Sequence, residues 1–302
     1  MYTATDPRST LAPAAGAPAD EDVDIAAPEF ADFRADAPAE TTALGSRTWY
    51  VRAQNLVLAY TSARTGESLV RHGDPAEYVV LLPHAESAVR VSWQGREAEL
   101  RGQGMIVVPA GGSEVTAESD ADLVRLFTPD TPGIAELAGN AASYARPHPR
   151  VAIEEPWPAP ADGDALRVYP VADIPRSKDR FGRIFRTRSF MVNFLFPHEG
   201  PRDPEALSPH HHDEFEQISL AVQGEFEHHI RTPWTPKRSQ WREDVHTPLG
   251  SPSVAIIPPP TVHTSQAVGA STNQLIDIFA PPRKDFSAKP GWVLNADTYP
   301  AP

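Results

Sequence analysis

The sequence contains no cysteine, and this absence excludes two kinds of chemistry. Without thiols the chain can form no disulfide bond and offers no thiolate ligand, so nitrogen and oxygen atoms must hold any metal ion. Methionine is also scarce, with 3 residues against 33 prolines. Because proline interrupts helices, this composition favours short strands and loops over long helices.

Long apolar runs and positive charges are few as well. No stretch approaches the roughly 20 apolar residues of a membrane-spanning helix, and the first residues lack the basic and then apolar pattern of a signal peptide. The formal net charge is −13, which opposes binding to a phosphate backbone. We therefore expect a soluble cytoplasmic protein whose partners include neither a membrane nor a nucleic acid.

Much of the negative charge lies in residues 1–45, which hold nine acidic side chains against Arg8 and Arg34. This segment is rich in Ala, Pro and Asp and poor in branched apolar residues, a composition typical of disordered or extended chain. We expect an acidic N-terminal arm here. If the arm packs on a partner subunit, Phe30 and Phe33 are its candidate anchors.

From residue 46 the chain consists of short apolar runs separated by Gly and Pro. Runs of this length and spacing are typical of an antiparallel sandwich or barrel, so the sequence predicts an all-β fold. Further along, residues 183–196 predict either two strands or one bent strand. In residues 46–130 the predicted strands are Tyr50–Tyr60, Tyr78–Leu82, Val89–Trp93, Gly104–Pro109 and Leu123–Phe127.

Metal-capable side chains are concentrated in residues 209–224, Pro-His-His-His-Asp-Glu-Phe-Glu-Gln-Ile-Ser-Leu-Ala-Val-Gln-Gly. His210 and His212 are two residues apart, so an extended backbone can point both imidazoles the same way. His263, at the end of Pro-Pro-Pro-Thr-Val-His, arrives from a later predicted strand. Imidazole nitrogens bind divalent transition metals, so the three histidines predict a metal site.

A fourth ligand is available in the apolar run that follows. If residues 215–223 form a strand, alternation turns Gln217 toward a cavity lined by small residues and Glu216 toward the opposite, apolar face. This pattern favours Gln217, and Glu216 stays as the alternative. A purely structural interpretation also stays open, because three consecutive histidines can form a solvated loop and His263 can be a hydrogen-bonded core residue.

The spacing of these residues resembles the cupin superfamily. The first cupin motif is H-x-H, three or four residues, Glu, six residues, Gly. His210-x-His212, Gln217 and Gly224 match this spacing, with Gln in place of Glu. Choosing Glu216 instead keeps the residue type but leaves seven residues before the Gly.

The second cupin motif, Pro-x-Gly-x2-His-x3-Asn, resembles residues 258–263. Pro260 stands in the place of its Gly, and Ala267 stands in the place of its Asn. The resemblance implies that the three histidines and Gln217, or Glu216 instead, hold one divalent metal ion. Iron(II) is the ion that such sites often use, with Mn, Ni, Cu and Zn as alternatives.

Residues 46–130 resemble a second cupin domain that lacks a metal. Residues 104–112 match the second motif up to the position of its His, where no His stands, and His72 and His84 are not paired as H-x-H. The resemblance implies a bicupin with two jelly-roll β-barrels, one binding metal and one structural, that assembles as a homodimer or a larger homo-oligomer. The other expected segments are a Pro-rich connector at 131–164, the metal-binding domain at 165–285 and a docked tail at 286–302.

Side chains on neighbouring predicted strands are candidates for the chemistry around the metal. Arg186 and Arg188 precede the metal motif and could hold a substrate carboxylate or phenolate bidentately, or else face water on an edge strand. His229, Arg231 and Gln266 could support the metal ligands or transfer protons. Those of the five side chains that share the barrel interior with the metal are the candidates for these roles.

Open coordination positions on such a metal would let a substrate and O₂ react together, as in iron(II) oxygenases. With the resemblance, this predicts a dioxygenase for a small anionic substrate, with aromatic acids as candidates. Two alternatives stay open: an isomerase, lyase or decarboxylase that uses the metal only as a Lewis acid, and a small-molecule-binding protein without turnover.

Overall fold

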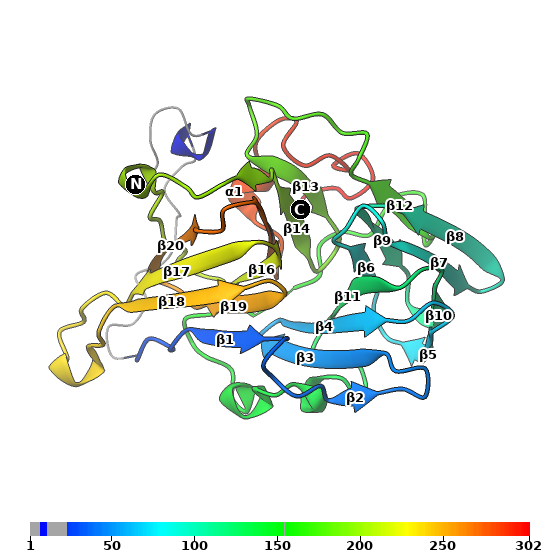
Figure 1. Ribbon diagram of the computed structural model, residues 1–302, viewed down its shortest axis with the longest axis horizontal. Helices are drawn as coiled ribbons and strands as arrows, with labels where there is room; N and C mark the ends of the chain where they lie inside the picture. The colour runs from blue at the N-terminus through cyan, green and yellow to red at the C-terminus, as the bar shows by residue number, and fades with distance from the viewer. Residues whose placement is uncertain (1–6, 11–22, 154) are drawn as a thin grey trace. The chain divides into compact units, whose positions relative to one another are not determined.

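The computed structural model describes residues 7–10, 23–153 and 155–302, whose regular backbone is almost entirely β (Figure 1). The chain divides into two compact units. One of them consists of segments that precede, interrupt and follow the other unit in the sequence. The remaining parts of the expected arm, residues 1–6 and 11–22, lie outside the described residues. The N-terminal unit comprises Ala37–Arg146 and Ala159–Pro175, and the C-terminal unit comprises the described part of Met1–Asp36 with Pro147–Pro158 and Arg176–Pro302.

The N-terminal unit contains a seven-stranded sheet, in the order β12-β9-β6-β11-β4-β3-β2, and a four-stranded sheet, in the order β5-β10-β7-β8. Two short 3₁₀ helices follow, η2 (Ala135–Leu137) and η3 (Ala141–Tyr144). The strands are β2 (Glu40–Thr41), β3 (Arg47–Ala53), β4 (Leu56–Ala63), β5 (Ser68–Asp74), β6 (Tyr78–Leu82), β7 (Ala88–Trp93), β8 (Arg96–Arg101), β9 (Gly104–Val108), β10 (Gly111–Ala117), β11 (Ala121–Phe127) and β12 (Arg167–Pro170).

One hydrophobic cluster with side chains from both sheets forms the core of this unit. The ring of Tyr78 stacks on Phe127 with centroids 5.1 Å apart, and its hydroxyl lies 2.9 Å from Ser113 Oγ. His72 is exposed, while His84 lies 3.4 Å from an Asp122 carboxylate oxygen. Within its described residues this unit has no cluster of metal-capable side chains. Aromatic and aliphatic groups occupy its interior instead.

The C-terminal unit has a similar plan. Its larger sheet has the order β1-β19-β16-β21-β14-β13, with β15 paired to β21, and its smaller sheet has the order β18-β17-β20. The predicted segment at 183–196 is two strands, β13 and β14. The elements are η1 (Pro7–Thr10), β1 (Glu29–Asp32), β13 (Gly182–Arg186), β14 (Met191–Leu195), β15 (His198–Glu199), η4 (Pro204–Ala206), β16 (Gln217–Gln223), β17 (Glu225–Arg231), η5 (Arg238–Gln240), β18 (Val245–Gly250), β19 (Ser253–Ile257), β20 (Val262–Ala267), β21 (Thr272–Phe279) and α1 (Lys284–Ser287).

Strand register decides which side chains share the inner face of the larger sheet. Gln217 on β16 lies opposite Phe279 on β21, and Ser219 lies opposite Asp277. Opposed residues of an antiparallel pair point to the same face, and neighbours along a strand point to opposite faces. Gln217, Ser219, Asp277 and Phe279 therefore share one face, and Glu216 lies just before the first residue of β16.

The arm contributes a strand to the C-terminal unit. Glu29–Asp32 form β1, which pairs with β19 at the edge of the larger sheet. Phe30 packs against a cluster that includes Ile230 and Ile257, and Phe33 is buried. Both expected anchor residues thus contact the C-terminal unit of their own chain.

Gly224, the last residue of the first cupin-like motif, connects β16 to β17 and must be glycine. Its φ is +84°, a left-handed conformation that glycine adopts without strain. A Cβ atom at this position would lie 2.7 Å from the Thr272 carbonyl oxygen. Any other residue would shift the turn that follows the metal motif.

Candidate metal centre

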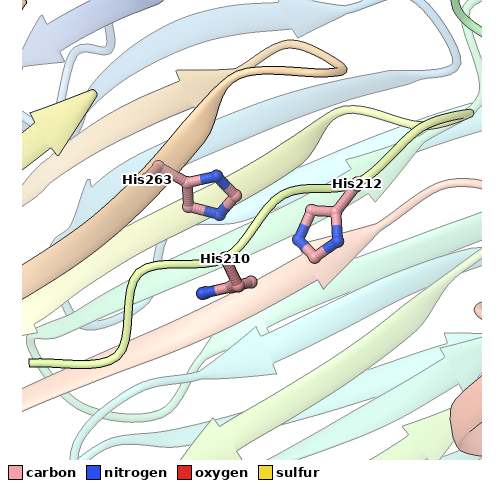
Figure 2. Close-up of side chains that lie close together, drawn as sticks. All are labelled: His210, His212 and His263. Carbon is pink, nitrogen blue, oxygen red and sulfur yellow. The ribbon is translucent and has the colours of Figure 1, made fainter. Parts of the chain in front are cut away.

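Three histidine rings converge in the C-terminal unit (Figure 2). His210 and His212 lie in the extended segment before β16, and His263 lies in β20. An isolated antiparallel bridge holds the segments together: His210 N donates to His263 O at 3.0 Å, and His263 N donates to His210 O at 2.7 Å. The ring centroids are 4.4 to 5.1 Å apart. One nitrogen of each ring lies within 4.8 Å of the others, so the three can bind one ion.

Backbone carbonyls set the tautomers of two of these rings. His210 Nδ1 lies 2.9 Å from Ser208 O, and His263 Nδ1 lies 3.1 Å from Thr261 O. A carbonyl oxygen can only accept, so each Nδ1 carries the hydrogen and each Nε2 carries the lone pair that can bind a metal ion. This arrangement orients both imidazoles for metal binding through Nε2.

Gln217 brings a fourth donor atom to the cluster. Its Oε1 lies 2.8 Å from His212 Nε2 and 3.4 Å from His263 Nε2. Its Nε2 donates to Ser219 Oγ at 2.9 Å and to Asp277 Oδ1 at 3.1 Å, and Ser219 Oγ also donates to Asp277 Oδ1, at 2.8 Å. Because Asp277 accepts from the amide nitrogen, the amide oxygen must face the histidines.

Glu216, the alternative ligand, lies elsewhere. It is buried beside Gln217, but its carboxylate does not belong to the cluster of metal-capable groups around the three histidines in the described part of the chain. The donor set that the structure brings together is three imidazoles and one amide oxygen. Nitrogen and neutral oxygen donors of this kind suit divalent Fe, Mn, Ni, Cu and Zn.

Burial keeps the three imidazoles neutral and thus competent as ligands. It lowers the pKa of His210 and of His212 well below the usual value, and it lowers the pKa of His263 to about 4. The nearby positive charge of Arg283 lowers these pKa values further. Burial has the opposite effect on an acid and raises the pKa of Asp277 to about 6, although hydrogen bonds from Ser219 and Gln217 lower it in part.

Arg283 is a site residue that sequence reasoning missed. Its buried guanidinium lies 3.6 Å from the ring centroid of Phe286 and 5.2 Å from that of Phe215, whose ring in turn stacks on His212 with centroids 4.7 Å apart. Its Nε and Nη2 donate to Asp285 at 3.0 and 2.5 Å. Arg283 follows β21, and no motif or spacing links it to the histidines.

Arg8 is the second cation near the cluster. This residue of η1 lies over the ring of Phe181 at 4.6 Å, and its charge lowers the pKa of His210 and His263. In the sequence it is one of two arginines in an acidic segment, with no pattern that points to the site.

Arg186 and Arg188, expected to hold a substrate anion, are bound to backbone carbonyls instead. Arg186 is fully buried, and its Nε donates to Tyr299 O at 3.1 Å. Arg188 Nε donates to Trp157 O, also at 3.1 Å. These bonds hold the C-terminal tail and the connector to the end of β13. The sequence identified the two arginines as candidates, but it did not show that the connector and the C-terminal tail lie next to them.

His229, Arg231 and Gln266, the candidates to support the metal ligands or transfer protons, lie on the other face of the smaller sheet. On β17, Ile230 lies opposite His263 of β20, so alternation turns His229 and Arg231 away from that face. Gln266 alternates with Ser265 in the same way. The inward histidine is His228, which is fully buried with its Nδ1 2.8 Å from Ser265 Oγ. Register between strands, which one sequence does not encode, decides this outcome.

Solved structures share this architecture. The oxalate decarboxylase of Lactobacillus farciminis in complex with formate matches with a TM-score of 0.56 over 84% of this chain and 86% of its own, at 12% identity. The Bacillus subtilis oxalate decarboxylase at pH 4.6 matches with a TM-score of 0.54 over 83% of this chain and 76% of its own, at 13% identity. No protein-family profile and no curated protein sequence matches the chain.

These matches confirm the predicted all-β cupin fold in its bicupin arrangement. At such identities they establish the fold, and the function has to be argued from the site. No helix in the described part of the chain is long and apolar enough to cross a membrane.

Proposed function

We propose that this chain is a mononuclear metal-dependent cupin enzyme that acts on a small carboxylate-bearing substrate. The observation that carries the proposal is the convergence of His210, His212, His263 and Gln217 Oε1 beside the buried Arg283. A divalent metal held by these four neutral donors keeps its full charge and supplies Lewis acidity, or redox chemistry if it is iron or manganese.

The residues around the ligands prepare the site for this chemistry. Carbonyls of Ser208 and Thr261 hold two imidazoles in the binding tautomer, and Asp277 with Ser219 holds the amide of Gln217. The rings of Phe215 and Phe279 pack beside His212 and exclude water from that side. A site arranged in this way needs little reorganisation when metal and substrate bind.

Arg283 is the proposed anchor for the substrate carboxylate. With Nε and Nη2 bound to Asp285, its Nη1 makes no hydrogen bond to a described residue. A guanidinium hydrogen bond to a carboxylate is charge-assisted and short. The same positive charge that lowers the histidine pKa values would favour an anion next to the metal.

Two reaction classes fit this arrangement. The first, predicted from the sequence, is dioxygenation with iron(II) and O₂. The second is a decarboxylation or another lyase or isomerase reaction in which the metal acts as a Lewis acid. The similar solved structures are oxalate decarboxylases, which favours this class as a candidate. Consumption of O₂ distinguishes the first class from the second.

The test begins with elemental analysis of protein purified without chelator. After anaerobic loading with iron(II) or manganese(II), O₂ uptake and CO₂ release are measured with oxalate, salicylate and catechol-type acids. We expect one metal ion per chain at this site and turnover of a carboxylic acid. His263→Ala should lose the ion and the turnover, while His211→Ala, which changes an exposed histidine between two ligands, should keep both. A His263→Ala protein that binds as many metal ions as the wild type would contradict the assignment.

A further inference from the structure

A second group of metal-capable side chains lies on the outer face of the smaller sheet. Glu227 and His229 are two residues apart on β17, so they point to the same side. His246 on β18 lies directly opposite His229, and Gln266 on β20 lies directly opposite Glu227. Three adjacent strands (Figure 1) thus bring these side chains to one place.

The three side chains already have the spacing of a ligand set. One donor atom each from Glu227, His229 and His246 lies within 4.8 Å of the others. His229 Nδ1 lies 2.7 Å from His246 Nδ1, and the two ring centroids are 4.9 Å apart. Two imidazole nitrogens at this distance can share one hydrogen, and a metal ion binds the same lone pairs when it takes the place of that hydrogen.

Gln266 orients His229 for this role. Its Oε1 lies 3.1 Å from His229 Nε2, and an amide oxygen can only accept, so Nε2 carries the hydrogen. His229 Nδ1 then carries a lone pair on the side of His246, and the Glu227 carboxylate lies 4.0 Å from the same imidazole ring, at Nε2. Outer hydrogen bonds of this kind fix the tautomer and the ring orientation of metal-binding histidines.

This group is separate from the three-histidine site. His263 and Gln266 are three residues apart on β20 and point to opposite faces of the sheet. His246 is exposed, and the side chains of His229 and Glu227 are 20% and 36% accessible. Solvent can therefore complete the coordination shell, and an ion can enter without a change of fold.

We propose that Glu227, His229 and His246 bind a second divalent transition metal ion, of the zinc class. Two imidazoles and one carboxylate form a ligand set that zinc takes with water in its fourth position. Magnesium and calcium prefer sets made only of oxygen atoms. The bound ion joins β17 to β18, the two strands that enclose the excursion at residues 232–244.

The experiment is a zinc titration of the full chain against a chromophoric chelator, with bound zinc counted by elemental analysis after dialysis. We expect two zinc ions per chain in the wild type and one in the His246→Ala protein. Glu227→Gln should weaken the second site by removing its negative charge. Gln266→Ala, which keeps all three ligands, should weaken that site by about 10- to 100-fold. His198→Ala, an exposed histidine on β15, is the matched control and should keep two ions.

The two sites are distinguished by which variant loses which ion. His263→Ala should lose the inner ion and keep the one that His246→Ala loses. Cobalt(II) in place of zinc gives a visible absorption band for a four-coordinate site. The absorbance that the wild type shows and the His246→Ala protein lacks belongs to the outer site. A His246→Ala chain that binds as many zinc ions as the wild type would overturn the proposal. His246 is exposed, so its substitution leaves the core intact.

Discussion

At the scale of single residues, the neighbours of Gln217 explain why this position differs from the first cupin motif. Gln217 stands where the motif carries Glu, and Asp277 on the neighbouring strand supplies a buried carboxylate 3.1 Å from the Gln217 amide nitrogen. A Glu at position 217 would place two buried carboxylates side by side, and these could not both be ionised. The amide at 217 and the acid at 277 therefore depend on each other.

This dependence predicts the outcome of a double-mutant cycle. Gln217→Glu should lower the free energy of unfolding of the metal-free protein at neutral pH, because it adds a buried charge beside Asp277. Adding Asp277→Asn should recover much of the loss, with a coupling of about 1–3 kcal/mol. This coupling free energy is measured by urea unfolding of the wild type, the two single variants and the double variant. Simple additivity of the two single changes would show that the residues do not interact.

Arg283 gives a second prediction at this scale. Arg283→Gln should raise KM for the carboxylate substrate by about tenfold or more, because a charge-assisted hydrogen bond is lost. Metal stoichiometry should stay unchanged, and Arg283→Lys, which keeps the charge, should recover part of the affinity. Arg64→Gln, a change of an exposed arginine, is the control. An unchanged KM in the Arg283→Gln enzyme would place the substrate elsewhere.

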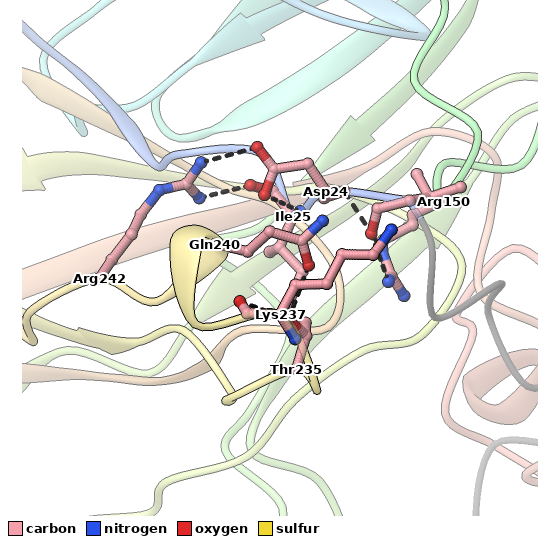
Figure 3. Close-up of polar contacts among 8 residues, drawn as sticks. Asp24, Ile25, Arg150, Thr235, Lys237, Gln240 and Arg242 are labelled. Carbon is pink, nitrogen blue, oxygen red and sulfur yellow. Dashed lines mark hydrogen bonds and ion pairs between the residues drawn. The ribbon is translucent and has the colours of Figure 1, made fainter.

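At the scale of secondary-structure elements, two arginines hold the arm that carries β1 (Figure 3). Arg150 Nη2 donates to Val23 O at 2.7 Å, and Arg242 donates to Ile25 O and lies 3.5 Å from the Asp24 carboxylate. The acidic arm therefore has cationic partners on the connector and on the excursion between β17 and β18. These contacts lead the chain to β1, where Phe30 packs beside Ile230 and Ile257.

Phe30→Ala tests whether this strand contributes to stability. We expect it to lower the free energy of unfolding by about 1–3 kcal/mol, less than for a fully buried phenylalanine because Phe30 is partly exposed. Leu44→Ala removes an exposed leucine and should cost under about 0.5 kcal/mol. Urea denaturation, monitored by circular dichroism, gives the free energies of unfolding of the two variants and the wild type. Equal stabilities of the two variants would mean that β1 adds nothing to the fold.

Tyr50 on β3 makes the N-terminal unit sensitive to alkali. Burial raises the pKa of its hydroxyl from 10.0 to about 12, and a hydrogen bond to Glu40 at 2.5 Å contributes. The unfolded chain loses this proton near pH 10 and the folded chain only near pH 12, so the free energy of unfolding falls as the pH rises between these values, by about 2–3 kcal/mol in total. Urea unfolding across this range should give a shallower pH dependence for Tyr50→Phe than for the wild type. The same slope in both proteins would contradict the assignment.

At the scale of the whole molecule, the two units differ in their response to metal. An ion that binds only the folded state stabilises it by mass action, by about 2.7 kcal/mol at a concentration one hundred times Kd. Hydrogen exchange should therefore slow in residues 208–217 and 262–264 on metal addition. Peptides from β6 and β11 of the N-terminal unit are the internal control and should exchange as before. Protection that rises equally in both units would contradict a site confined to the C-terminal unit.

How far the sequence predicts this molecule depends on how local each feature is. Alternation within β16 is local, and Gln217 lies beside the histidines, while the Glu216 carboxylate is not in their group of metal-capable side chains. Whether His228 or His229 points inward depends on the turn at Gly224 and on pairing with β20, which are not local. Arg283 reaches the histidines only because the chain returns after β21. Local patterns thus predicted the side chains that converge in the candidate metal centre, while the residues around them could be identified only from the fold.

The pairing of β1 with β19 also orders events in time. Phe30 leaves the ribosome long before Ala255, the residue that it faces across the sheet. At roughly 5–20 residues per second, the arm waits on the order of ten seconds or more for its partner strand. During that interval the whole N-terminal unit, which ends at Pro175, is synthesised. Strand β1 is therefore synthesised early but is among the last strands to pair, and synthesis must pass residue 257 before β19 can complete this edge of the larger sheet in the C-terminal unit.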